Sequence, residues 1–218
     1  MDSIHSLIQY FTELPGVGPR QAKRFVYFLL SRNARYLDEM CRLIQDLKNT
    51  IKTCTECFRF FPNDTRDGLI CNICKNINRD KASLMIVCRD VDFETIEKSH
   101  LYNGKYFILG GTVPVLEKVP EKKIRLNELL STVERRAETE GLREIIFAMS
   151  VNPEGENTLD FLKQSLTPVT QKYSITMSAL GRGLSTGTEL EYSDSDTIKN
   201  ALKNRVSERK SDDSIIKT

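Results

Sequence analysis

The chain has 218 residues, of which 39% are hydrophobic and 28% charged, a composition typical of a globular protein that can bury its own core. No apolar run approaches the ~18 residues of a transmembrane helix, and the N-terminal sequence predicts no signal peptide, so membrane, collagen-like and disordered classes are excluded. Basic residues number 32 and acidic residues 30, so net charge alone indicates no partner.

Apolar residues recur at helical spacing in the first part of the chain and predict three helices within residues 1–52. A tight turn, LPGVGP at 14–19, separates the first helix from the second. No acidic residue stands between Glu13 and Asp38. The cations in that stretch are Arg20, Lys23, Arg24, Arg32 and Arg35.

The turn has the features of a phosphate-binding hairpin. Gly16 and Gly18 allow the backbone to turn tightly with its N–H groups directed outward. Arg20, Lys23 and Arg24 open the next helix, where the helix dipole already favours an anion. We therefore predict a sequence-independent DNA contact of the helix-hairpin-helix kind. The alternative is an ordinary helical hairpin with solvated cations, because a G-x-G pair alone is a weak signal.

Four of the six cysteines form two C-x-x-C pairs, Cys54 with Cys57 and Cys71 with Cys74. Each pair places two thiolates on one turn, so the two pairs can complete a tetrahedron around zinc. Residues 53–80 carry too few apolar side chains to fold by burial, which favours a structural zinc whose four positions are all filled by protein. The alternative is a redox dithiol pair or unrelated free thiols.

The other potential nucleophiles and ligands have no partner in the sequence. Cys41 continues a helical stripe and Cys88 ends an apolar run, so both are expected to be small core side chains. His5 and His100 are the two histidines, and neither lies in a ligand-like pattern. This scarcity of histidine argues against Ser-His and Cys-His catalysis.

From residue 84 onward, short apolar runs alternate with helical periodicity, which predicts a parallel α/β sheet. Residues 190–192 (LEY) are expected to add an edge strand, and Asp194 to cap a last helix. The expected strands are 84–88, 106–109, 144–149 and 174–180, and the expected helices between them are 126–140 and 156–166.

Four acidic residues follow predicted strands: Asp90 and Asp92 after the first, Glu154 and Glu156 after the third. Loops at the carboxyl ends of parallel strands converge, so these carboxylates could hold a magnesium ion. The interpretation that we favour is that the glutamates cap a helix N-terminus and form a solvated or protein-docking surface. The glycine-rich loop 181–187 matches no phosphate-binding fingerprint, and Arg182 is its one candidate contact for a ligand or neighbouring subunit.

The order of these modules resembles the RecR family of bacterial recombination mediators, over residues 4–206. The matching motifs are LPGVG at 14–18, the four cysteines, Y-x-G-x-Y at 102–106, LGG at 109–111, EGE at 154–156, and RGL, G, LEY and D between 182 and 194. The resemblance implies an α/β multi-module protein. Its expected parts are a helix-hairpin-helix domain (1–52), a C4 zinc motif (53–80), a Toprim-like parallel α/β domain (81–180), a C-terminal strand and helix segment for oligomerisation (181–206), and a flexible tail (207–218).

The resemblance implies a non-enzymatic, cytoplasmic, nucleoid-associated protein that forms rings, from dimers to tetramers, around DNA. Such proteins act with RecO, and in some contexts RecF, to load the RecA recombinase onto single strands coated by single-strand-binding protein. Matched residue by residue, the resemblance assigns DNA contact to Gly16, Gly18, Arg20, Lys23 and Arg24. It assigns one zinc ion to Cys54, Cys57, Cys71 and Cys74. It assigns RecO docking to Glu154 and Glu156.

Two departures from Toprim enzymes bear on catalysis. Cys88 stands where those enzymes carry a glutamate, and Ser150-Val151-Asn152 where they carry paired aspartates. Metal-dependent phosphoryl transfer needs several carboxylates, so a magnesium nuclease or primase is the weaker alternative. A third alternative, a zinc adaptor that binds only protein, is disfavoured by the acid-free basic stretch.

Overall fold

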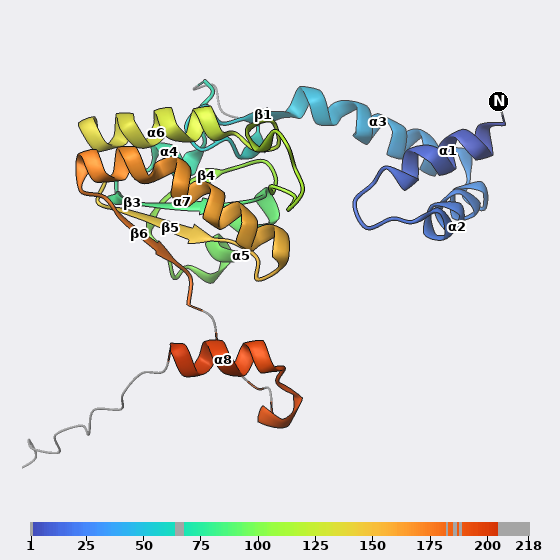
Figure 1. Cartoon of the computed structure of the whole chain (residues 1–218). Coiled ribbons are helices and arrows are strands. Elements are labelled where there is room, and N and C mark those ends of the chain that lie inside the picture. Colours follow the sequence, from blue (N-terminus) through green and yellow to red (C-terminus); the bar gives the residue numbers. More distant parts are fainter. Residues whose placement is uncertain (1, 64–67, 182, 185–186, 188, 205–218) are drawn as a thin grey trace, which may run out of the picture. The chain divides into compact units, whose positions relative to one another are not determined.

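The computed structural model describes residues 2–63, 68–181, 183–184, 187 and 189–204 (Figure 1). Two units can be distinguished, one built from residues 1–54 and 60–70, the other from residues 55–59 and 71–218. Arg182 lies outside the described residues. None of the described helices is long and apolar enough to span a membrane.

The first unit holds the three predicted helices, α1 (Ser3–Thr12), α2 (Pro19–Leu30) and α3 (Ala34–Thr50). Side chains cap two of them: Asp2 accepts a hydrogen bond from the Ile4 N–H at 3.1 Å, and Asn33 accepts one from the Tyr36 N–H at 2.9 Å. Phe11 of α1 packs edge-on against Phe25 of α2, with ring centroids 6.0 Å apart. The unit also contains a two-stranded antiparallel sheet of β1 (Ile51–Thr53) and β2 (Phe60–Pro62).

The prediction that Cys41 is a core side chain is wrong, because Cys41 lies exposed on α3. No residue of α3 is fully buried, and its apolar residues Leu43, Ile44 and Leu47 are exposed as well. Helical spacing shows that one face of a helix is apolar. It does not show that anything within the chain covers that face.

The second unit is built on a four-stranded parallel sheet, which confirms the predicted α/β fold. Its strand order is β4-β3-β5-β6, and the central strand β3 pairs with both β4 and β5. The strands are β3 (Asp80–Val87), β4 (Gly104–Ile108), β5 (Glu144–Ala148) and β6 (Thr176–Ala179).

Alternation along the strands directs side chains to helices on both faces of the sheet. Leu84 and Phe107 share a core cluster with Leu129 of α6 (Leu126–Thr139) and Leu162 of α7 (Pro153–Tyr173). Those two helices lie side by side over one face (Figure 1). Tyr106 faces the opposite way and meets Phe93 of α5 (Asp90–Ser99) edge-on, with centroids 4.8 Å apart.

Three local features differ from the sequence prediction. Helix α5 was not predicted, because Phe93 is its one buried residue and the apolar stripe is short. Helix α7 extends beyond 156–166 at both ends. The edge strand expected at 190–192 is wrong: Leu190–Tyr192 is a 3₁₀ turn (η2), whose exposed side chains bury too little to hold a strand.

The remaining elements are short. The 3₁₀ turn η1 (Pro120–Lys122) precedes α6, and α4 (Asn72–Lys75) carries the second C-x-x-C pair. The last helix, α8 (Ser195–Lys203), has the expected cap: the Asp194 carboxylate accepts a hydrogen bond from the Thr197 N–H at 2.9 Å.

Candidate metal centre and nucleic-acid interface

The four predicted cysteine ligands converge in the structure. The sulfur atoms of Cys54, Cys57, Cys71 and Cys74, here called the cysteine cluster, all lie within 4.8 Å of one another. None is in a disulfide, and the Cys57 and Cys71 sulfurs are 3.6 Å apart. Four thiolates at about 2.3 Å from a tetrahedral zinc would be separated by roughly 3.8 Å, so the arrangement fits such an ion. In the described part of the chain, no other group of three or more Cys, His, Asp or Glu converges in this way.

A buried lysine holds the second half of the cysteine cluster. The Lys105 ammonium, on β4, donates hydrogen bonds to the backbone carbonyls of Ile73 at 3.1 Å, Cys74 at 2.9 Å and Asn76 at 2.9 Å. Its residue is 4% exposed, and all three ammonium hydrogens find acceptors at the C-terminal end of α4. Burial lowers the pKa of Lys105, whereas the nearby Cys74 thiolate favours its charged form. Lys105 therefore ties the metal-binding turn to the sheet.

The first half of the cluster is attached to the same strand through its backbone. The Ile108 N–H donates to the Cys57 carbonyl at 2.8 Å, so β4 continues its hydrogen bonding into the first C-x-x-C turn. Arg125 donates to the Ile108 carbonyl at 2.9 Å and stacks its guanidinium over the Phe58 ring at 5.6 Å. Strand β4 thus contacts both cysteine turns.

The predicted hairpin lies in the first unit, between α1 and α2. Gly16 has a φ of +77°, a left-handed conformation that disfavours other residues, and the Val17 N–H closes the turn onto the Leu14 carbonyl at 3.0 Å. Gly18 forms the N-cap of α2 without a side chain, so nothing covers the first turn from that position. Arg20, Lys23 and Arg24 all lie exposed on the first turns of α2, here called the basic end of α2.

The two glutamates of the EGE motif lie exposed in the first turn of α7, where the helix dipole favours negative charge. Glu154 accepts a hydrogen bond from the Thr112 hydroxyl at 2.9 Å. Asn152 caps the helix by accepting from the Gly155 N–H at 2.8 Å. Asp90 and Asp92 occupy the equivalent first turn of α5. All four acids therefore sit at helix N-termini.

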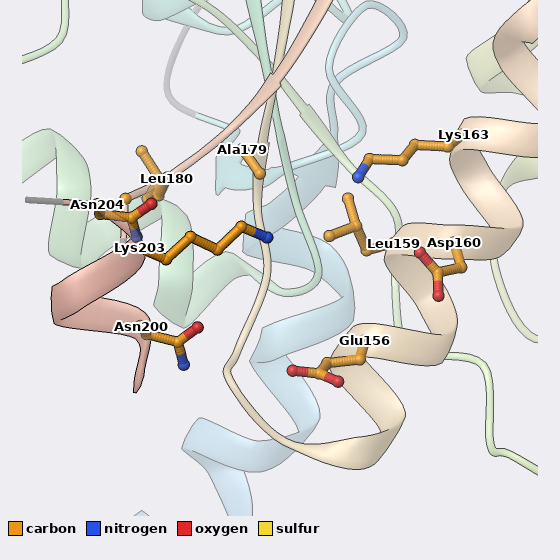
Figure 2. A pocket seen from close by; sticks show the side chains of 10 residues that line it. Glu156, Leu159, Asp160, Lys163, Ala179, Leu180, Asn200, Lys203 and Asn204 are labelled. Carbon is orange, nitrogen blue, oxygen red and sulfur yellow. The ribbon is translucent and has the colours of Figure 1, made fainter. Parts of the chain in front are cut away.

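A hollow of about 350 Å³ opens beside these acids, between α7 and α8 (Figure 2). Glu156 and Asp160 line it together with Lys163 of α7 and Lys203 of α8. The two lysine ammonium groups point into it from opposite sides (Figure 2). Since both signs of charge are present, the hollow is not an all-carboxylate pocket of the kind that magnesium prefers.

Comparison with known proteins places these modules in one family. The family model described as "RecR, helix-hairpin-helix" matches residues 4–49, "Toprim domain" matches 82–177, and "RecR, C-terminal" matches 183–206. A protein named Recombination protein RecR from Legionella pneumophila (strain Corby) is 33% identical over 206 residues, covering 94% of this chain and 98% of that protein. A protein of the same name from Rippkaea orientalis is 32% identical over 199 residues, covering 91% and 94%.

The chain belongs to the RecR family. The cysteine cluster lies between the regions matched by the helix-hairpin-helix and Toprim models. The EGE motif lies inside the region matched by the Toprim model.

The EGE motif of this RecR-family chain has a steric basis as well as an electrostatic one. A Cβ at Gly155 would collide with the backbone carbonyl oxygen of Ser150, so the turn into α7 closes only around glycine. Behind it, the Thr158 hydroxyl accepts from the Val113 N–H at 2.8 Å, and Asn157 donates to the Val113 carbonyl at 3.0 Å. The acidic end of α7 is thereby fixed to the loop after β4.

Cys88, directly after β3, is a buried and neutral thiol. It donates to the Met149 sulfur at 3.2 Å, which confirms the expectation that it is a core side chain. Burial, with a smaller effect of the Asp92 carboxylate, raises the pKa of Cys88 to about 11. At neutral pH this position therefore presents no negative charge to a metal ion.

Sequence reasoning missed Lys105. Its signal was present, since a lysine within a strand that is otherwise apolar has to find buried acceptors. The carbonyls that accept from it lie 29 to 32 residues away in the chain, and no local pattern identifies them.

Replacing Lys105 with methionine should weaken the metal site from outside its ligand set. Three carbonyls would lose their donor, and each one that stays shielded from water would cost about 1–3 kcal/mol. We expect a lower unfolding midpoint and faster release of the bound metal to a chelator, measured with a colorimetric indicator. Lys81→Met, at an exposed lysine of β3, is the matched control. Equal release rates for the two variants would show that Lys105 does not support the site.

Proposed function

We propose that this chain is a non-enzymatic, DNA-binding recombination mediator that assembles into rings and acts with a RecO-like protein, and with RecF, to load the RecA recombinase during recombinational repair. The relatives named Recombination protein RecR, aligned over more than nine-tenths of the chain, support the recombination role. The observation that carries the DNA-binding part is the basic end of α2, placed directly after a hairpin with a left-handed glycine.

In this proposal the protein binds DNA through contacts to its phosphate groups. The N-terminus of α2 offers backbone N–H groups and a favourable dipole to an anion, and Arg20, Lys23 and Arg24 supply mobile positive charge around it. None of these groups distinguishes one base from another, so binding would be independent of sequence and sensitive to salt.

We propose that the ion of the cysteine cluster is zinc and that its role is structural. Four thiolates match the preference of zinc for soft ligands, and with all four positions taken by protein no site remains for a reacting water. The short elements around it, β1, β2 and α4, bury few apolar side chains, so the ion would supply much of their folding free energy.

Self-association into dimers or tetramers is supported by the exposed apolar face of α3. Leu43, Ile44 and Leu47 are each more than half exposed, and together with Tyr36 and Met40 they line a shallow groove along the helix. An exposed apolar surface of this kind marks an interaction site in a soluble protein.

The second candidate function, a Toprim nuclease or primase, is disfavoured by the carboxylate set. Glu154 and Glu156 are present, but the neutral Cys88 thiol and the Ser150-Val151-Asn152 segment replace the remaining carboxylates. We propose instead that the acidic end of α7 docks a basic partner, most simply RecO, through charge complementarity.

Replacing Arg20, Lys23 and Arg24 with alanine should weaken binding to all DNA sequences alike. Each lost phosphate contact reduces the slope of log K against log salt by about 0.9 on duplex DNA, so the triple variant should show a clearly flatter salt dependence. Fluorescence anisotropy across a salt series measures both quantities. Replacement of the exposed Lys81, Lys98 and Lys118 of the second unit is the charge-matched control. A loss confined to one sequence would indicate base readout and a different kind of module.

The chain should bind one zinc ion, and Cys54→Ser should lose it. Elemental analysis of protein purified without chelator gives the stoichiometry, and thermal unfolding reports the accompanying loss of stability. Cys41→Ser, at an exposed cysteine outside the cluster, should keep both the metal and the unfolding midpoint. Retention of zinc and full stability in Cys54→Ser would contradict the assignment.

Glu154→Lys combined with Glu156→Lys should abolish association with a RecO-like protein and leave zinc content and intrinsic DNA binding in place. Partner pull-down measures the association, and a nuclease assay with magnesium or manganese tests the competing function. If the wild-type chain cleaves DNA and the double variant does not, the docking role is replaced by a catalytic one.

A further inference from the structure

The exposed face of α2 carries aromatic rings as well as cations. Tyr27 and Phe28 are 53% and 44% exposed, and Tyr36, in the first turns of α3, is 43% exposed. The Arg32 guanidinium lies 4.1 Å from the Phe28 ring centroid and 5.9 Å from that of Tyr36. Phe28 and Tyr36 meet edge-on, with centroids 6.4 Å apart. These four side chains, Tyr27, Phe28, Arg32 and Tyr36, form what we call the aromatic–arginine strip.

The strip continues the basic end of α2 along the same helix face. Residues four apart on a helix are neighbours, so Lys23 precedes Tyr27 and Arg24 precedes Phe28, one turn earlier in each case. The Lys23 ammonium lies 5.9 Å from the Tyr27 ring centroid, so the side chains of this first pair are neighbours. The buried residues of α2, Ala22 and Val26, lie on a different face of the helix from these two pairs. One surface therefore runs from the cations at the basic end of α2 to partly exposed aromatic rings.

The charge and chemistry of this surface limit its occupant. No acidic residue stands between Glu13 and Asp38, so the surface favours a polyanion over a protein of mixed charge. Exposed rings next to cations suit a polyanion with flat, apolar faces to stack. The bases of a single strand offer such faces, whereas in a duplex they are covered by the neighbouring base pairs.

We propose that the aromatic–arginine strip is a base-stacking site for single-stranded DNA. It rests on the proposed DNA-binding function and deepens it. The basic end of α2 holds the backbone, and bases of the same strand stack on Tyr27 and Phe28, with the Arg32 guanidinium plane extending the platform. Single strands then bind more tightly than duplexes, without sequence preference, because every base has a stacking face.

The experiment replaces the two aromatic rings with apolar side chains that cannot stack on a base. Tyr27→Leu with Phe28→Leu should weaken binding to oligo-dT by about tenfold to a hundredfold, while binding to a duplex of equal length changes by less than about twofold. An abasic oligonucleotide, which keeps the phosphates and lacks bases, should bind wild type and variant equally. Tyr36 stays unchanged because it also borders the apolar groove of α3.

Two further variants serve as controls. Tyr27→Phe with Phe28→Tyr preserves both rings and should retain the preference for oligo-dT over the abasic strand. Tyr10→Leu removes an exposed tyrosine from α1 and should have no effect. Circular dichroism and light scattering without DNA report folding and oligomeric state for every variant.

Three results would overturn the proposal. One is an unchanged preference for oligo-dT over the abasic strand in the leucine variant, which would leave only phosphate contacts. Another is an equal loss on single strands and duplexes. The third is a changed oligomeric state of the leucine variant without DNA, which would make the strip an interface between copies of the chain. Failure of the broader DNA-binding function is distinct, since the wild-type chain would then bind none of the three ligands.

Discussion

The hydrogen bonds from Lys105 to the carbonyls of Ile73, Cys74 and Asn76 are the interaction on which the metal-binding region depends. The turns that carry the cysteines have almost no apolar core of their own. A buried ammonium with every hydrogen directed at a carbonyl is a strong, directional anchor, and its positive charge also offsets the negative charge that four thiolates bring to one point. Strand β4 therefore serves two purposes, as an edge of the Toprim-like sheet and as the support of the metal site.

A net charge of +2 conceals a strong separation of charge along the chain. Cations without acids gather at the N-terminus of α2, where the helix dipole adds to their field. Acids gather at the N-termini of α5 and α7, where the dipole offsets part of theirs. The same backbone feature thus adds to a basic surface at one helix end and offsets the charge of an acidic surface at another. The charge of the side chains in the first turn therefore decides whether a helix end attracts an acidic or a basic partner.

Local patterns predicted the parts of the fold that depend on local physics. Apolar runs identified all four strands of the parallel sheet, and two C-x-x-C pairs identified the cysteine cluster, because spacing alone brings two sulfurs to one turn. The sequence could not show whether another element covers an apolar helix face, or which distant residues accept a hydrogen bond from a buried side chain. Cys41 has core-like spacing but lies exposed, and the acceptors of Lys105 come from a turn about thirty residues away. The LEY segment had strand-like residues but satisfies its backbone within a 3₁₀ turn.

The carboxyl edge of the sheet combines an acidic helix end with a neutral buried thiol. Gly155 closes the turn into α7 and Asn152 caps the helix, while Asn157 and Thr158 bond it to Val113 in the loop after β4, so these contacts fix the position of the acidic end. At the end of β3, the neutral thiol of Cys88 packs against Met149 and offers no charged ligand to a metal ion. Glu154 and Glu156 remain exposed on this supported helix end, and exposed carboxylates can attract a basic protein through charge complementarity. The edge is therefore compatible with the proposed recognition of a basic protein, and among the described residues no group of three or more carboxylates converges there.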